Sequence, residues 1–200
     1  MKLRSALAVG FASLALCAVQ SAAHAATLNV EYDVSGTSHV THTDNDITIA
    51  PTTLSISNDT STNTFTGHMP IAPAQSHFYV AGFLPIDAKV NFIEAAPLTG
   101  VIGRGFANTT ASYYLRLSDV KVGGLPMIVG SHCQTKDPVV ITASTPAGST
   151  FNITNGGHLT GSYTIGNFEN CLLQAWLINL LVPGSDNSVS LDVANGRFVA

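Results

Sequence analysis

The chain has 200 residues, of which 46% are hydrophobic and only 10% are charged, and its formal net charge is −4. This composition excludes an intrinsically disordered chain, a coiled coil and a basic nucleic-acid-binding protein. Three cysteines are also too few for a small disulfide-dense scaffold.

The first 25 residues have the pattern of a secretory signal peptide. Lys2 and Arg4 give a positive start, and residues 6–19 are almost uninterrupted apolar sequence. Residues 23–25 (Ala-His-Ala) place small side chains at the two positions that a signal peptidase reads. The apolar stretch is about 14 residues long, whereas a membrane-spanning helix needs roughly 20. We therefore expect cleavage near Ala25, a secreted or cell-envelope location, and a protein that is not an integral membrane protein.

The processed chain is more acidic than the precursor. Removal of Lys2 and Arg4 leaves six basic residues against twelve acidic ones, so the net charge becomes −6. An acidic surface is a poor match for anionic partners, and we expect no nucleic-acid partner.

Two cysteines, Cys133 and Cys171, remain after processing. An exported chain folds under oxidising conditions, so this pair predicts a disulfide. A metal or redox pair is the alternative, but the chain has no Cys-x-x-Cys and zinc would need two further ligands. Closing this loop would stabilise the fold by roughly 4 kcal/mol in the chain-entropy model.

Runs in which apolar and polar residues alternate predict about a dozen short, half-buried strands. In chain order the clearest runs are residues 28–34, 47–49, 54–56, 88–92, 114–122, 139–142, 151–153, 163–165 and 189–193. Clusters of turn-forming residues separate them at 57–60, 122–124, 154–157 and 183–187. The pattern favours an all-β fold, specifically an antiparallel immunoglobulin-like β-sandwich.

The mature chain can be divided into two related β units, residues 26–100 and 105–200. Sliding the chain by 94 residues aligns Asn58 and Thr60 with Asn152 and Thr154, which supports an internal repeat. The two units form either separate sandwiches or the halves of one larger sandwich. The stretch 97–105 is typical of a loop that connects them.

One segment, residues 171–182 (CLLQAWLINLLV), is apolar almost all round. It is too short to span a bilayer, and Pro183-Gly184 would end a helix there. We expect a short helical segment or a core strand that is buried and pinned by Cys171. Trp176, the only tryptophan, is then a filler of the core.

The sequence contains no recognisable catalytic motif. There is no Gly-x-Ser-x-Gly elbow, and Ser149 has no implied base. The acidic residues Glu31, Glu94 and Glu169 lie in unrelated places, so no carboxylate pair for sugar hydrolysis can be identified. We predict no catalytic residues and no cofactor.

Metal binding has two weak signals. His39 and His42 lie three residues apart, which on a strand points them to opposite faces unless a turn intervenes. The triplet Asp44-Asn45-Asp46 resembles the opening of a calcium loop but lacks the later Gly and terminal Glu. We therefore predict no metal site.

Several segments resemble those of a broad group of exported actinobacterial proteins of unknown function. The segments are VGSHCQTKDPV (129–139), GHLTGSYTIGNFENC (157–171), LLVPGSDN (180–187), FTGHMP (65–70) and VAGFLPIDAKV (80–90). The resemblance implies a secreted β-sandwich in which Cys133 and Cys171 pair, and it carries no known activity. Gly166 stands where that group usually has Pro, and Leu172 follows Cys171 where Gly is usual.

The leading hypothesis is a non-enzymatic secreted or cell-envelope β-sandwich protein with a structural or binding role. Its expected partner is a cell-wall or lipid component. The alternative is a carrier of an apolar, lipid-like ligand in a cavity between the sheets, because the chain is rich in aliphatic residues. A hydrolase on a β scaffold is a third possibility, since a fold does not dictate function.

Overall fold

The computed structural model describes residues 26–200, so the predicted signal peptide lies outside the described residues. The strands are β1 (Thr27–Val40), β2 (Asn45–Asp59), β3 (Thr64–His68), β4 (Ala74–Val80), β5 (Leu84–Gly103), β6 (Phe106–Val122), β7 (Leu125–Pro126), β8 (Gln134–Thr135), β9 (Val139–Ser144), β10 (Gly156–Ile165), β11 (Phe168–Glu169) and β12 (Gly184–Val199). The helical segments are η1 (Thr41–Thr43), η2 (Leu172–Gln174) and α1 (Ala175–Leu181). The predicted all-β, antiparallel fold class is confirmed.

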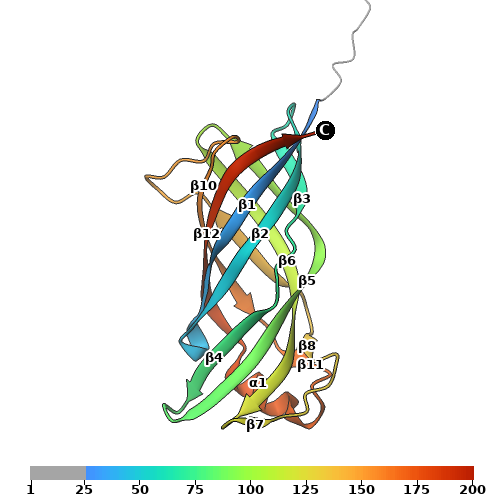
Figure 1. Ribbon diagram of the computed structural model, residues 1–200, viewed down its shortest axis with the longest axis vertical. Helices are drawn as coiled ribbons and strands as arrows, with labels where there is room; N and C mark the ends of the chain where they lie inside the picture. Colours follow the sequence, from blue (N-terminus) through green and yellow to red (C-terminus); the bar gives the residue numbers. More distant parts are fainter. Residues whose placement is uncertain (1–25) are drawn as a thin grey trace, which may run out of the picture.

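All twelve strands belong to one antiparallel sheet that closes on itself. From β1 the order of neighbours runs through β2, β3 and β5 in one direction, and through β12, β10, β9 and β6 in the other. The long hairpin of β5 and β6 joins the two ends, with pairing from Ile86↔Val122 to Gly103↔Phe106. The result is a tall cylinder of strands, in which β1 begins and β12 ends at the same upper end (Figure 1).

The hydrophobic core fills the inside of this cylinder. On β1 the side chains of Val30, Tyr32 and Val34 are buried, whereas the residues between them are partly exposed. The same alternation runs along β2, β6 and β12. Because successive side chains of a strand point to opposite faces, each strand gives one face to the core and one to water. Opposite walls thus pack against each other like the two layers of a sandwich.

Glycines allow the sheet to coil tightly enough to close. A Cβ atom on Gly36 would lie 2.1 Å from the Ser190 carbonyl oxygen, and one on Gly161 would lie 2.0 Å from that of Thr142. Only glycine fits where neighbouring backbones approach so closely. Strong coiling at such positions is what closure of a β-sheet requires.

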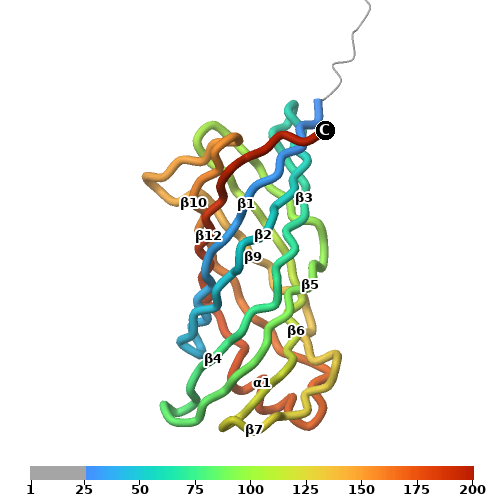
Figure 2. Tube along the Cα trace, in the orientation of Figure 1, coloured from blue at the N-terminus to red at the C-terminus, as the bar shows by residue number. Residues whose placement is uncertain are grey.

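The strands are longer than the sequence pattern predicts. The runs 47–49 and 54–56 both lie in β2, and the run 151–153 forms isolated bridges in place of a strand. The stretch 97–105, predicted as a connecting loop, is the end of β5 and a tight turn before β6. Pro97 is tolerated within β5 because the register shifts there, between Ala96 and Thr99. Strands from 26–100 and from 105–200 therefore adjoin in the same sheet (Figure 2).

The segment after Cys171 lies at the lower end of the cylinder (Figure 1). A disulfide joins Cys171 to Cys133, and both residues are fully buried, which confirms the predicted pairing. A disulfide is compatible with an extracellular location.

Within residues 26–200, no helix is both long and apolar enough to cross a membrane.

Candidate binding site

An apolar cavity of about 100 Å³ lies inside the lower half of the cylinder. Strands β1, β2, β4, β5, β6, β9, β10, β11 and β12 contribute to its wall, and α1 closes it from one side. Its polar lining consists of hydroxyl groups, and no Lys, Arg, His, Asp or Glu of residues 26–200 lines it. Representative apolar lining residues are Ile47, Phe78, Ala88, Val90, Leu117, Ile178 and Leu181, and the hydroxyl groups belong to Ser38, Thr43, Ser76 and Tyr163.

A second apolar cavity of about 50 Å³ lies in the upper half. It shares the lining residues Ile49, Ile71, Ile141 and Val189 with the lower cavity, so these four side chains form the boundary between the two. The interior is therefore a nearly continuous apolar column along the axis of the cylinder.

Three buried tyrosines, Tyr32, Tyr113 and Tyr163, supply polar groups in this column. Tyr32 donates a hydrogen bond of 2.7 Å from its hydroxyl to the Ile153 carbonyl oxygen, and Tyr113 donates one of 2.8 Å to that of Met69. Burial raises the pKa of Tyr32 to about 12 and also raises the pKa of Tyr113 and Tyr163. These phenols are therefore neutral and act as structural ties inside an apolar interior.

The α1 segment is fastened at three points. The disulfide fixes its start through Cys171, and Ile178 is buried in the lower cavity with only 6% of its surface exposed. The Asn179 side chain accepts a hydrogen bond of 2.6 Å from the backbone N–H of Phe168 and donates one of 2.9 Å to the backbone carbonyl oxygen of Phe168. This side chain therefore binds β11 as a neighbouring strand would.

The outer face of the same segment is apolar and exposed. Leu173 is 86% exposed, Trp176 is 69% exposed and Leu180 is 61% exposed. The prediction of a short helical segment is correct, but the prediction that it is buried and that Trp176 fills the core is wrong. The segment lies at the end of the cylinder, where one helix face meets the core and the other meets solvent.

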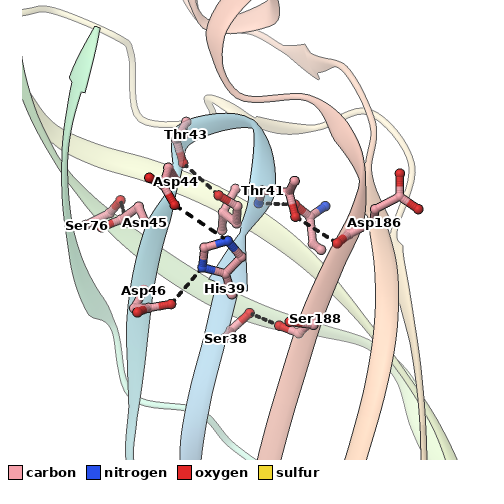
Figure 3. A network of polar contacts seen from close by, with 12 residues as sticks. Ser38, His39, Thr41, Thr43, Asp44, Asn45, Asp46, Ser76, Asp186 and Ser188 are labelled. Carbon is pink, nitrogen blue, oxygen red and sulfur yellow. Dashed lines mark hydrogen bonds and ion pairs between the residues drawn. The ribbon is translucent and has the colours of Figure 1, made fainter. Parts of the chain in front are cut away.

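A polar network surrounds the turn η1 between β1 and β2 (Figure 3). Asn187, which is fully buried, accepts a hydrogen bond from the Thr41 backbone N–H and donates to the carbonyl oxygens of Tyr163 and Gly184. Ser38 shares a hydrogen bond of 2.6 Å with the Tyr163 hydroxyl. These contacts tie β1, β10 and β12 together beside the lower cavity.

The residues that give weak metal signals converge only in part. His39 Nδ1 lies 2.8 Å from Asp46 Oδ1 and its Nε2 lies 3.9 Å from Asp44 Oδ1 (Figure 3), whereas His42 Nδ1 lies 2.6 Å from the Pro183 carbonyl oxygen. Asp44 occupies the left-handed position that ends η1. In the part of the chain that the structure describes, no three His, Cys, Asp or Glu side chains are grouped so that they could hold a metal ion.

A Ser-His-Asp arrangement that the sequence did not reveal lies on the outer face of β10 and β12. His158 Nδ1 lies 2.9 Å from Asp192 Oδ1, and His158 Nε2 lies 3.4 Å from Ser190 Oγ. The order of contacts matches that of a hydrolytic triad. However, β12 is paired with β1 on one side and β10 on the other, so its backbone N–H groups are engaged and are not free to form an oxyanion hole.

The three glutamates for which the sequence shows no carboxylate pairing lie on separate strands. Glu94 on β5 accepts a hydrogen bond from the Met69 backbone N–H and pairs with His68, whereas Glu31 lies on β1 and Glu169 on β11. Ser149 lies at the end of a turn, in which the Ser149 backbone N–H donates a hydrogen bond to the Pro146 carbonyl oxygen.

Comparison of the chain with protein-family models, with curated protein sequences and with solved structures found no match.

Proposed function

We propose that this is a non-enzymatic protein of the cell exterior that binds a neutral apolar molecule inside its closed sheet. The observation that carries the proposal is the lower cavity, whose walls are aliphatic and aromatic and whose polar groups are uncharged hydroxyls. Small-molecule sites are typically concave and apolar with a few placed polar groups.

The lining argues for a neutral ligand. A carboxylate or ammonium group taken into this cavity would lose its hydration without meeting an opposite charge, which is strongly unfavourable. An alcohol, ester or hydrocarbon carries no such penalty, and the hydroxyls of Ser76 and Tyr163 can hydrogen-bond a single polar end.

The size of the cavity sets a condition on binding. An apolar cavity of ~150 Å³ stays dry and accepts benzene, so the closed lower cavity of about 100 Å³ accepts only a small apolar group. A longer chain must extend toward the upper cavity or displace part of the wall. The four shared residues at the boundary, Ile49, Ile71, Ile141 and Val189, are the side chains that would adjust.

The proposed location and partner rest on separate features. The signal-peptide pattern and the disulfide support export, and the resemblance to exported actinobacterial proteins supports a bacterial cell envelope as the setting. The exposed apolar side chains of Leu173, Trp176 and Leu180 suit contact with a lipid or cell-wall component.

A cavity-filling variant tests the proposal. Ala88 lines the lower cavity, so Ala88→Leu occupies part of its volume, whereas Ala50→Leu makes the same change on the exposed face of β2. N-phenyl-1-naphthylamine is larger than the closed lower cavity, so it must extend past the four boundary side chains toward the upper cavity. We expect it to fluoresce on binding to the wild-type protein and to Ala50→Leu, and to bind Ala88→Leu much more weakly. Equal binding by all three proteins, or no binding by any, would contradict the proposal.

A further inference from the structure

Two neighbouring strands in the wall of the lower cavity lie side by side without a hydrogen-bonded ladder. In the described part of the chain, β2 pairs with β3 only from Ser55 to Asp59, and β4 pairs only with β5. β2 nevertheless contacts β4, and its residues 45–54 lie outside the part that pairs with β3. We call this unpaired boundary between residues 45–54 and β4 the seam.

Prolines explain why the seam does not close with backbone hydrogen bonds. Pro51 lies in β2 at the seam, and Pro70 and Pro73 lie in the segment that leads from β3 to β4. Proline has no backbone N–H and cannot donate to a ladder, so it is confined to edges and irregular positions of a sheet. The pairing of β2 with β1 also shifts register close to Pro51, between Val34 and Gly36.

The lower cavity lies directly behind the seam. Ile47 and Ile49 from the β2 side line it, as do Ser76 and Phe78 from the β4 side. Separation of the two strand edges would therefore connect the cavity with the outside without breaking any strand pair.

A side-chain hydrogen bond holds the two edges together at the lower end of the seam. Asn45 Nδ2 donates to Ser76 Oγ at 2.8 Å, and both residues are buried, with 9% and 8% of their surface exposed (Figure 3). Higher along the seam, the Thr52 hydroxyl donates to the Pro70 carbonyl oxygen. On the α1 side of the cavity, the disulfide and both hydrogen bonds of Asn179 would resist opening.

We propose that the seam is the route by which a neutral apolar molecule enters the lower cavity, with the Asn45–Ser76 hydrogen bond as its latch. This inference rests on the proposed binding function. The charged groups at the lower end of the seam agree with a neutral ligand: Asp44 and Asp46 stand on the β2 side, and His77 paired with Asp87 stands on the β4 side. An anionic headgroup would meet carboxylates there.

Cross-linking across the seam tests the route. Asn45→Cys combined with Ser76→Cys places two thiols where the latch lies, and dibromobimane can bridge them. The control is Thr37→Cys combined with Thr48→Cys, because these exposed positions are directly paired on β1 and β2, which are already hydrogen-bonded. The association rate of N-phenyl-1-naphthylamine is then measured by stopped-flow fluorescence for each bridged protein and for the wild type.

We expect the bridged seam to slow association by about tenfold or more, because binding then needs a rarer conformational change. The bridged control should associate at the wild-type rate. Equal rates for both bridged proteins would overturn the proposed route while leaving the binding function intact. Absence of dye binding in the wild type would overturn both.

A single substitution keeps the proposal testable if the double variant does not fold. Ser76→Ala removes the acceptor of the latch, so we expect the dye to associate faster than with the wild type. An unchanged or slower rate would contradict a role of Asn45 and Ser76 as the latch.

Discussion

Truncation of the one buried side chain of α1 tests whether this segment is seated on the core. Ile178 is 6% exposed and lines the lower cavity, so Ile178→Ala removes aliphatic surface from an apolar environment. Truncation of a buried Ile to Ala typically costs 2–5 kcal/mol of stability. Since a cavity already adjoins the side chain and some of its contacts are missing, we expect a loss near the lower end, about 2–3 kcal/mol.

The matched control is Leu180→Ala on the same helix, where the side chain is 61% exposed. Removal of exposed aliphatic surface changes stability by only about 0.5 kcal/mol. The free energy of unfolding of both variants and of the wild type is measured by urea denaturation with the disulfide intact. A loss below about 1 kcal/mol for Ile178→Ala, or an equal loss for both variants, would refute the packing of α1 on the cavity.

Three further outcomes are expected. Burial raises the pKa of Tyr32 from its ordinary value of 10.0 to about 12. The neutral phenol therefore contributes its full stabilisation of the fold below pH 10, and this contribution is lost as the pH rises from 10 through 12. The free energy of unfolding should therefore fall more steeply above pH 10 for the wild type than for Tyr32→Phe, and equal slopes in urea titrations would contradict the burial of this hydroxyl. Replacement of both Cys133 and Cys171 by Ala should lower stability by about 2–4 kcal/mol in the same assay, and an unchanged unfolding midpoint would show that the crosslink does not constrain the chain. Hydrolysis of p-nitrophenyl acetate should be no faster with the wild type than with Ser190→Ala, and a rate that this substitution abolishes would replace the binding function with a hydrolytic one.

Local patterns in the sequence predict much of the fold. The alternation in residues 28–34 predicts a strand with one buried face, and β1 buries Val30, Tyr32 and Val34 on that face. Two cysteines in a chain with a signal-peptide pattern predict the disulfide. Both predictions depend on residue type and spacing, which the sequence displays directly.

Closure of the sheet and the position of the site depend on contacts between distant residues. The pairing of β5 with β6 and of β1 with β12 closes the sheet. These strands would show the same alternation of apolar and polar residues in an open sheet, so the alternation does not predict closure. A segment that is apolar all round does not show which of its sides meets water, so the sequence predicts a buried segment with Trp176 in the core, whereas Trp176 is exposed.

Single polar residues within apolar stretches are sequence signals of side chains that hydrogen-bond distant segments near the site. Asn179 interrupts the apolar run 171–182, and its side chain is the one that fastens α1 to β11. In the sequence Asn45 belongs to an acidic triplet, whereas in the fold its amide donates a hydrogen bond to Ser76 across the seam. Buried amides of this kind need hydrogen-bond partners, and those partners come from distant segments of the chain.

Native mass spectrometry of the processed protein, purified without detergent from its own host, tests the central claim most directly. We expect a population with a bound neutral lipid-like molecule, and this population should be depleted in Ala88→Leu and retained in Ala50→Leu. If the wild type showed only the mass of the polypeptide and also bound no apolar probe, the claim that the protein binds a neutral apolar molecule would be contradicted.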